Sequence, residues 1–185
     1  MAEPERPIPE VYVQPGESHL VPQPTILRTV LGSCVGITFL VPRLSIGALC
    51  HPMLPRLPES RFNWLSVSSG RRYVDFAIRD MARQLDERGA RRNEAVVKLF
   101  GGADVLSVGD ESSRPTVGKL NCESALRILE EEGFMVSACS LGGTYGVHIQ
   151  FETGTGEVLL RRLDSGTNGR KSNTRRAVHR RGRRS

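Results

Sequence analysis

Residues 29–55 hold the side chains best suited to chemistry in this 185-residue chain, a cysteine and a histidine on either side of an expected hairpin. If the turn is centred on Pro42 and Arg43, Cys34 and His51 lie directly opposite each other, with Cβ atoms about 4.5–5.5 Å apart. A thiol beside an imidazole can become a thiolate at neutral pH, and a thiolate attacks carbonyl carbon. The pattern predicts an acyl-transfer site, provided that the register places both side chains on one face of the sheet.

The residues around the cysteine offer two further parts of such a site. Gly32 and Ser33 let the backbone turn tightly before Cys34, so that amide N–H groups there can stabilise a developing oxyanion. Thr29 is close enough in the sequence to offer a hydroxyl that orients His51. The same residues also fit a structural interpretation, in which a tight turn adjoins a buried cysteine and a hydrogen-bonded core histidine.

The other cysteines and histidines form weaker patterns. Cys50 immediately precedes the candidate base and points to the opposite face of its strand, which indicates a core residue. Cys122 and Cys139 lie on apolar faces and are expected to pack. The four scattered cysteines include no CxxC pair and are expected to be free thiols, and His148 and His179 are isolated, so neither a metal site nor a cofactor is expected.

Hydrophobic patterning predicts the elements that position these residues. The diglycines at 101–102 and 142–143 lack the lysine of a phosphate-binding loop and are expected to let backbones approach closely. Strands are expected over 25–31, 35–41, 44–50, 95–100, 134–141, 147–151 and 157–163, and helices over 71–88 and 121–132. Leu126 and Leu129 are expected to face inward from the second helix. Two separated helices among many strands favour an α+β layered sandwich.

Proline content and charge divide the chain into three segments. Residues 1–24 contain six of the eleven prolines and are expected to form an extended lead-in, in which 11–13 can add an edge strand. The folded domain is expected over 25–163. Residues 165–185 hold eight of the 26 Lys and Arg residues and no acidic residue, so a disordered basic tail is expected over 164–185.

The composition also excludes several classes of protein. The net charge of +6 resides in the tail, which leaves a nearly neutral body and argues against specific nucleic-acid binding. No apolar run approaches the roughly 20 residues that cross a bilayer, so no membrane insertion is expected. The proline-rich, acidic N-terminus is unlike an export signal, which predicts a cytoplasmic protein.

Six separated motifs, in this order, resemble those of the CheD family of chemoreceptor glutamine deamidases. They are LGSCVG at 31–36, HPMLP at 51–55, YVDFAI at 73–78, KLFGGADVL at 98–106, GKLN at 118–121 and LGG at 141–143. The resemblance covers about residues 25–163 and implies a single domain with a three-layer α/β/β sandwich. It also implies that Cys34 is the nucleophile, that His51 is the general base and that Thr29 completes the triad.

The activity that this resemblance implies is hydrolysis of glutamine side-chain amides to glutamate and ammonia through a cysteine thioester. The implied substrate is the cytoplasmic helical bundle of methyl-accepting chemoreceptors in bacterial chemotaxis. An alternative from a different class is a non-catalytic adaptor that binds and regulates a CheC-type phosphatase, although the presence of both Cys34 and His51 favours catalysis. A papain-like hydrolase would need an exported chain or a longer spacing between nucleophile and base. Nothing in the sequence indicates the substrate-binding residues.

Overall fold

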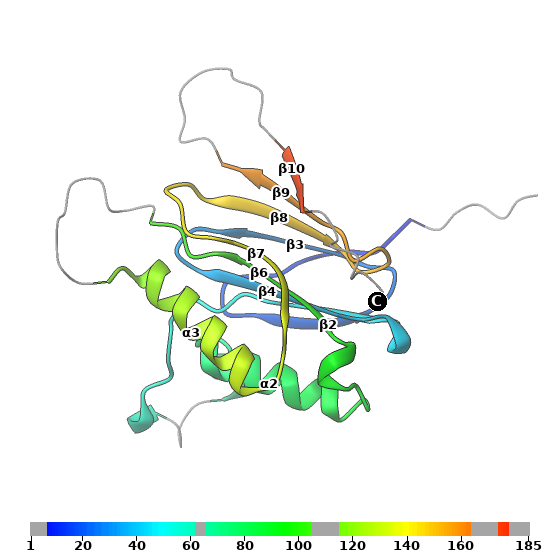
Figure 1. Cartoon of the computed structure of the whole chain (residues 1–185), viewed down its shortest axis with the longest axis horizontal. Coiled ribbons are helices and arrows are strands. Elements are labelled where there is room, and N and C mark those ends of the chain that lie inside the picture. The colour runs from blue at the N-terminus through cyan, green and yellow to red at the C-terminus, as the bar shows by residue number, and fades with distance from the viewer. Residues whose placement is uncertain (1–6, 62–65, 105–114, 164–173, 178–185) are drawn as a thin grey trace, which may run out of the picture.

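Two five-stranded β-sheets pack face to face, and helices cover the outer face of one of them (Figure 1). The computed structural model describes residues 7–61, 66–104, 115–163 and 174–177. The order in sheet A is β1 (Glu10–Tyr12), β3 (Ile26–Leu31), β8 (Val147–Glu152), β9 (Val158–Arg162) and β10 (Thr174–Ala177). The order in sheet B is β2 (Ser18–Pro22), β5 (Ile46–Cys50), β4 (Val35–Val41), β6 (Val96–Gly101) and β7 (Val136–Leu141).

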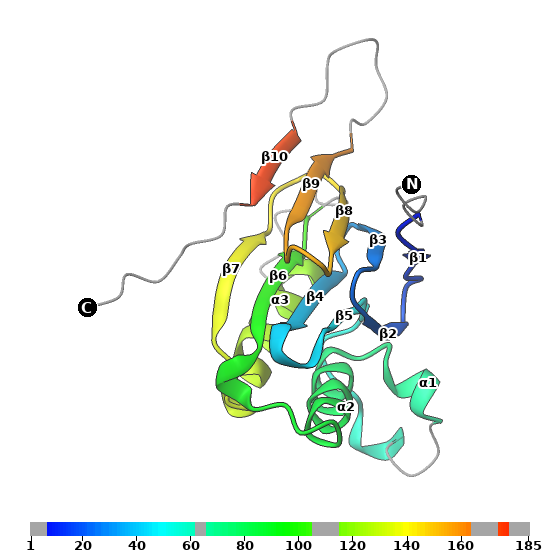
Figure 2. The same cartoon turned by 90° about the vertical axis from the view of Figure 1, so that its right-hand side faces the viewer.

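The helical layer lies against sheet B, so that the molecule has the order sheet A, sheet B, helices (Figures 1 and 2). The α-helices are α1 (Val67–Gly70), α2 (Val74–Asp86) and α3 (Val117–Glu131), and short 3₁₀ turns occur at Pro42–Leu44, Glu59–Arg61 and Arg92–Glu94. This arrangement confirms the expected single-domain α/β/β sandwich. No helix within the described ranges is long and apolar enough to cross a membrane.

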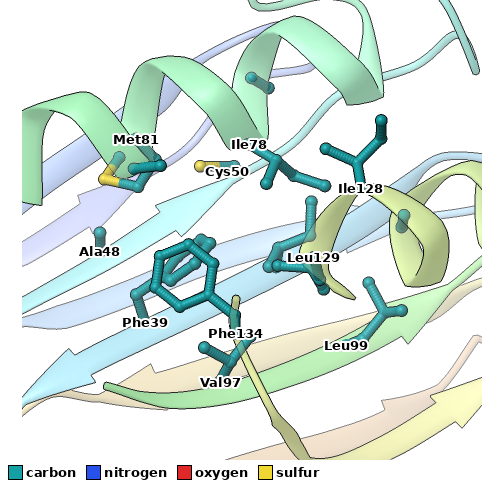
Figure 3. Close-up of a cluster of buried hydrophobic side chains, with 14 of the residues drawn as sticks. Phe39, Ala48, Cys50, Ile78, Met81, Val97, Leu99, Ile128, Leu129 and Phe134 are labelled. Carbon is teal, nitrogen blue, oxygen red and sulfur yellow. The ribbon is translucent and has the colours of Figure 1, made fainter. Parts of the chain in front are cut away.

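The central strand β4 explains why the sequence around it is apolar without interruption. All seven of its residues are buried, because one face of the strand meets the helices and the other meets sheet A. Ile37 joins the core between sheet B and the helices, and so does Phe39, which is labelled in Figure 3. Leu40 joins the second core, between the two sheets, where it packs with Leu27 and Phe151.

Helices α2 and α3 each bury an apolar stripe against sheet B. On α2 the buried residues include Ile78, Met81 and Leu85, at the helical spacing that the sequence predicts. On α3, Leu129 is buried as expected, but Leu126 is 43% exposed. The prediction for Leu126 is wrong because the buried stripe of α3 is centred on Asn121, Ala125 and Ile128, at spacings of three and four residues, and at about 100° per residue Leu126 lies outside that stripe.

The chain on either side of the expected domain adds strands to the sheets. The segment expected as an extended lead-in contains β1, which pairs parallel to β3, and β2, which pairs antiparallel to β5. The expected edge strand at 11–13 is present as β1. Within the tail expected to be disordered, Thr174–Ala177 instead forms β10 on the open edge of β9, because an edge strand offers unpaired N–H and C=O groups. The rest of 164–185 lies outside the described residues.

Candidate active site

The hairpin between β4 and β5 has a different turn from the expected one. Val41 pairs with Ile46, and the four residues between them form a 3₁₀ turn at Pro42–Leu44 followed by Ser45, whose φ is 52°. A two-residue hairpin turn requires a positive φ at its first central position. Proline cannot adopt a positive φ because its ring holds φ near −65°. The longer turn therefore moves the positive φ to Ser45.

This turn changes the partner of the candidate base. The pairing of Ile37 with Cys50, continued by one residue, places His51 opposite Gly36 and not opposite Cys34, so the predicted direct pairing is wrong by two residues. Two residues are one full period of side-chain direction in a strand, so the shift keeps both side chains on one face.

Both side chains face the space between the two sheets. The Cys34 side chain packs against the inter-sheet core. His51 is 1% exposed, and its ring reaches across to β3, where Nδ1 lies 2.7 Å from Oγ1 of Thr29. The structure therefore brings the three residues named by the sequence into one region, with Cys34 and His51 as diagonal rather than opposed neighbours.

The contact between Thr29 and His51 determines which nitrogen of the ring carries the proton. The Thr29 hydroxyl donates its only hydrogen to the backbone oxygen of Val13, at 2.7 Å. The same oxygen atom must then accept a hydrogen from His51 Nδ1, since a hydroxyl has one donor and two acceptor positions. In the neutral ring the proton therefore sits on Nδ1, and Nε2 carries the lone pair that can accept a proton.

Burial keeps His51 neutral. Desolvation lowers the pKa of His51 below 6.5, although the Val13 carbonyl and the Glu17 carboxylate act in the opposite direction. Its Nε2 is buried and has no hydrogen-bond partner within the described part of the chain. A buried polar atom without a partner is costly, which indicates that Nε2 is reserved for a group that arrives with the substrate or during the reaction.

Cys34 is half-buried, and burial also raises the pKa of its thiol. From the sequence, a thiol beside an imidazole can become a thiolate at neutral pH, but in the structure both pKa shifts favour the neutral forms. The resting pair is therefore a thiol and a neutral imidazole. Such a pair can still form a thiolate if the proton moves from Sγ to Nε2 as the sulfur attacks, which is general-base catalysis.

The backbone before Cys34 has its carbonyl groups bound and its amide groups free. Ala103 N–H donates to the Gly32 carbonyl and Gly102 N–H donates to the Cys34 carbonyl, each at 2.8 Å. The N–H groups of Gly32 and Ser33 donate to none of the residues that the structure describes, and the Cys34 N–H contacts only the sulfur of its own side chain. Two successive free N–H groups beside a nucleophile form a concave donor site for a negatively charged oxygen.

Asn121 also belongs to this region, although its side chain was not predicted from the sequence to take part in the site. Its side-chain Nδ2 donates to the Ser33 carbonyl at 2.8 Å and to the Met53 carbonyl at 3.0 Å. Asn121 is fully buried on α3. An amide side chain on the inward stripe of an amphipathic helix was the available signal, since a buried polar side chain is nearly always hydrogen-bonded to something specific.

Glycine is required at 101–102 and at 142–143 for different structural reasons. A Cβ on Gly101 would lie 2.4 Å from the Cys34 carbonyl oxygen, and a Cβ on Gly102 would lie 2.1 Å from the Cys122 sulfur. The expected close backbone approach is therefore present at 101–102. The backbone also approaches closely at 142–143, where the Gly142 N–H donates to the Gly101 carbonyl at 2.9 Å and the Gly143 carbonyl accepts from the Asp104 N–H at 2.7 Å. An added Cβ at either glycine would meet nothing within 4 Å, so glycine is required there by φ values of +74° and +85°.

The remaining cysteines and histidines differ in burial and in position. All four cysteines are free. Cys50 is a core residue as expected, and burial raises its pKa to about 12. Cys122 is half-buried, but Cys139 is exposed, so the expectation that it packs is wrong. His148 is partly buried on β8, and His179 lies outside the described residues.

Comparison with known proteins identifies the family. The family model described as "CheD chemotactic sensory transduction" matches residues 53–162. A protein of Geobacter sulfurreducens named "Probable chemoreceptor glutamine deamidase CheD 2" is 42% identical over 157 residues, which cover 85% of this chain and 92% of that protein. The chain belongs to the CheD family. A CheD protein of Maridesulfovibrio salexigens, also named as a probable chemoreceptor glutamine deamidase, is 38% identical and covers 85% of this chain and 94% of its own length.

The match to the CheD family model begins after His51, so the similarity to the model alone does not include Cys34 or His51. The two CheD relatives match most of their own length as well as most of this chain. Among solved structures, the Bacillus licheniformis hypothetical protein YfiH is 12% identical, with a TM-score of 0.45 over 69% of this chain and 51% of that chain.

Proposed function

We propose that this protein is a protein-glutamine deamidase that hydrolyses glutamine side-chain amides of methyl-accepting chemoreceptors to glutamate and ammonia. The observation that carries the proposal is the contact of Thr29 with His51. It leaves Nε2 as the proton acceptor in the same inter-sheet space as Cys34. The CheD relatives named as probable chemoreceptor glutamine deamidases support the choice of substrate.

The first half of the reaction forms a thioester. Cys34 Sγ attacks the amide carbon of the glutamine side chain while its proton passes to His51 Nε2. The amide oxygen becomes an oxyanion, and the free N–H groups of Ser33 and Cys34 donate to it. The imidazolium of His51 then protonates the departing nitrogen, the C–N bond breaks, and ammonia leaves.

The second half of the reaction hydrolyses the thioester. His51, neutral again, takes a proton from a water molecule as the water oxygen attacks the thioester carbon. The C–S bond breaks, the sulfur of Cys34 recovers the proton from His51, and glutamate is released. Thr29 keeps its hydrogen bond to Nδ1 throughout, so that Nε2 alone handles the transferred proton.

The consequence for the substrate is one added negative charge at each modified glutamine. A new carboxylate changes the packing and hydrogen bonding of a helical bundle and can shift the equilibrium between its conformations. This role requires that the protein acts in the cytoplasm, where the cytoplasmic bundle of a chemoreceptor is accessible. A CheC-type phosphatase is a further partner in this proposal, either of the enzyme or, in the alternative function, of a non-catalytic adaptor.

Mass spectrometry of a co-expressed chemoreceptor cytoplasmic domain tests the activity. With the wild-type protein we expect specific receptor glutamines to gain about one mass unit, as an amide becomes an acid, and Cys34→Ala to abolish the gain. Cys139→Ala is the matched control, because this cysteine is exposed on β7 and takes no part in the proposed reaction.

Two results would contradict the proposal. A mass gain that persists in Cys34→Ala would mean that another residue or another protein performs the deamidation. No gain with a receptor from the same organism would favour the adaptor, which would then be tested by co-purification with a CheC-type phosphatase.

A further inference from the structure

Asn121 joins the candidate active-site loop to the segment that carries the candidate base. Its Nδ2 donates both to the Ser33 carbonyl, next to Cys34, and to the Met53 carbonyl, two residues after His51. The side chain is fully buried, and its Oδ1 has no hydrogen-bond partner within the described residues. Two carbonyl acceptors assign the NH₂ group to this side, because the reverse orientation would place Oδ1 against two other oxygens.

The bond to the Ser33 carbonyl has a geometric consequence for the next amide. The Ser33 carbonyl and the Cys34 N–H belong to one planar peptide unit, and in a trans peptide these two groups point in opposite directions. Asn121 holds the carbonyl toward α3, so the Cys34 N–H must point away from α3. That N–H donates to no other residue within the described part of the chain, and its one contact is with the Cys34 sulfur itself.

The Gly32–Ser33 peptide unit is also oriented by a hydrogen bond to its carbonyl group. The Ala103 N–H donates to the Gly32 carbonyl, which fixes the direction of the Ser33 N–H in the same peptide plane. The backbone of 101–103 and the side chain of Asn121 together determine where the two free N–H groups point. The Ala103 N–H belongs to the backbone, whereas the Asn121 amide is a side chain and can be removed by substitution.

We propose that Asn121 is a positioning residue that orients the Cys34 N–H as an oxyanion donor. This inference rests on the proposed deamidase function, because it assigns a role within that reaction. Asn121 does not touch the substrate. It fixes the direction of the peptide dipole before the reaction starts, so that no reorganisation is needed when the negative charge develops on the amide oxygen.

Removal of Asn121 should affect two reactions of the Cys34 sulfur differently. Deamidation develops an oxyanion that needs the Cys34 N–H, whereas alkylation by iodoacetamide displaces iodide at a CH₂ carbon and develops no oxyanion. An amide donor that is misdirected by removal of Asn121 should therefore slow the first reaction and leave the second unchanged. A general disturbance of the thiol would slow both.

The experiment compares Asn121→Ala and Asn121→Asp with the wild-type protein and with Ser124→Ala. Asn121→Asp keeps the size of the side chain and replaces the donating NH₂ by an acceptor, so it is informative even if Asn121→Ala does not fold. Ser124→Ala is the matched control. The Ser124 hydroxyl lies one turn further along α3 and donates to the Pro55 carbonyl at 2.6 Å, so its loss weakens the docking of the same helix without touching the Ser33 carbonyl.

Two rates are measured for each variant: ammonia release from a chemoreceptor cytoplasmic domain, and alkylation of Cys34 by iodoacetamide, followed on the Cys34 peptide by mass spectrometry. For both Asn121 variants we expect kcat to fall about 100-fold, with KM within about twofold of the wild-type value. The alkylation rate of Cys34 should stay within about twofold of wild type. Ser124→Ala should retain kcat.

Three results would overturn the inference: unchanged kcat in the Asn121 variants, alkylation that slows in parallel with kcat, or an equal loss of kcat in Ser124→Ala. These results presuppose ammonia release that depends on Cys34. A wild-type protein that releases no ammonia, or a Cys34→Ala variant that still does, overturns the proposed function and this inference with it, so the two failures are distinguishable.

Discussion

At the scale of single residues, the candidate site depends on how hydrogen bonds distribute protons. Thr29 determines that Nδ1 of His51 carries the proton, because its own hydrogen is already donated to Val13. Burial then keeps both the thiol of Cys34 and the imidazole of His51 neutral. In the free enzyme the proton therefore remains on Cys34, and it moves to His51 only as the sulfur attacks the substrate.

This protonation state predicts the pH dependence of the reaction. As a base, His51 must be neutral, and its pKa in the folded protein lies below 6.5. As the pH falls, activity should therefore persist through 6.5 and be lost only as the pH passes the lower pKa of the folded state. A pH profile of kcat/KM for ammonia release, which reports groups of the free enzyme, should show its acid limb below 6.5.

An acid limb at or above 6.5 would contradict this prediction, since it would indicate an imidazolium stabilised by a thiolate. The assay needs a control for unfolding. The unfolded chain binds a proton at His51 near 6.5 and the folded chain only at lower pH, so stability decreases as the pH falls below 6.5. Circular dichroism at each pH separates loss of the fold from loss of the base.

At the scale of elements, the C-terminal end of β6 determines the conformation of the loop before β4. Gly101 approaches the Cys34 carbonyl so closely that no side chain fits between them, and its φ is +95°. The N–H groups of the next two residues, Gly102 and Ala103, donate to the carbonyls of Cys34 and Gly32 respectively. The conformation of the nucleophile loop is thus determined by a segment nearly 70 residues away in the sequence.

Gly101→Ala should therefore impair both stability and catalysis. The new Cβ would lie 2.4 Å from the Cys34 carbonyl oxygen, and relief of this clash must displace the nucleophile. We expect the free energy of unfolding in urea to fall by about 3 kcal/mol or more, and kcat for ammonia release to fall about 100-fold, as for a displacement of about 1 Å.

Gly89→Ala provides the comparison for this prediction. Gly89 follows α2, has a φ of +73°, and an added Cβ there would meet nothing within 4 Å. Its substitution should cost only the strain of a left-handed residue, about 1–2 kcal/mol, and leave kcat unchanged. Equal losses of stability and activity in the two variants would show that the approach to Cys34 is unimportant.

At the scale of the whole molecule, a buried lysine links the two sheets. Lys98 on β6 of sheet B is 3% exposed, and its Nζ donates to the Gly156 carbonyl at 2.7 Å. Gly156 lies in the turn between β8 and β9 of sheet A. Burial lowers the pKa of Lys98 below 10.5, although the nearby Glu157 carboxylate acts in the opposite direction.

The lowered pKa predicts how stability depends on pH. Between the lower pKa of the folded protein and 10.5, the unfolded chain binds more protons at Lys98 than the folded chain does, so stability rises with pH in this window. Lys98→Met removes this contribution. The free energy of unfolding of the wild type, measured relative to Lys98→Met in urea, should increase as the pH rises toward 10.5.

Lys119→Met is the control, because Lys119 is a largely exposed lysine on α3. Its substitution removes the same charge from an exposed position, so a rise that also appeared relative to Lys119→Met would not be specific to the buried lysine. A constant difference between wild type and Lys98→Met across the same range would show that burial does not affect the proton affinity of Lys98.

The sequence by itself indicated most of the elements and the candidate reactive groups. Strand β4 is located at Val35–Val41, as predicted, because seven successive apolar or small residues form a strand that is buried on both faces. Cys34, His51 and Thr29 could be named because few side-chain types perform nucleophilic and base chemistry, and their motifs lie close together. These are local properties, set by residue type and short spacing.

Only the tertiary structure decided the geometry of the site. The hairpin register followed from the inability of Pro42 to adopt a positive φ, a detail that patterning does not resolve. The neutral resting state of Cys34 and His51 followed from burial between two sheets, which is a property of packing. Asn121 reaches Ser33 across 88 positions, and such a contact exists only once the chain has folded, because nothing in the local sequence relates the two residues.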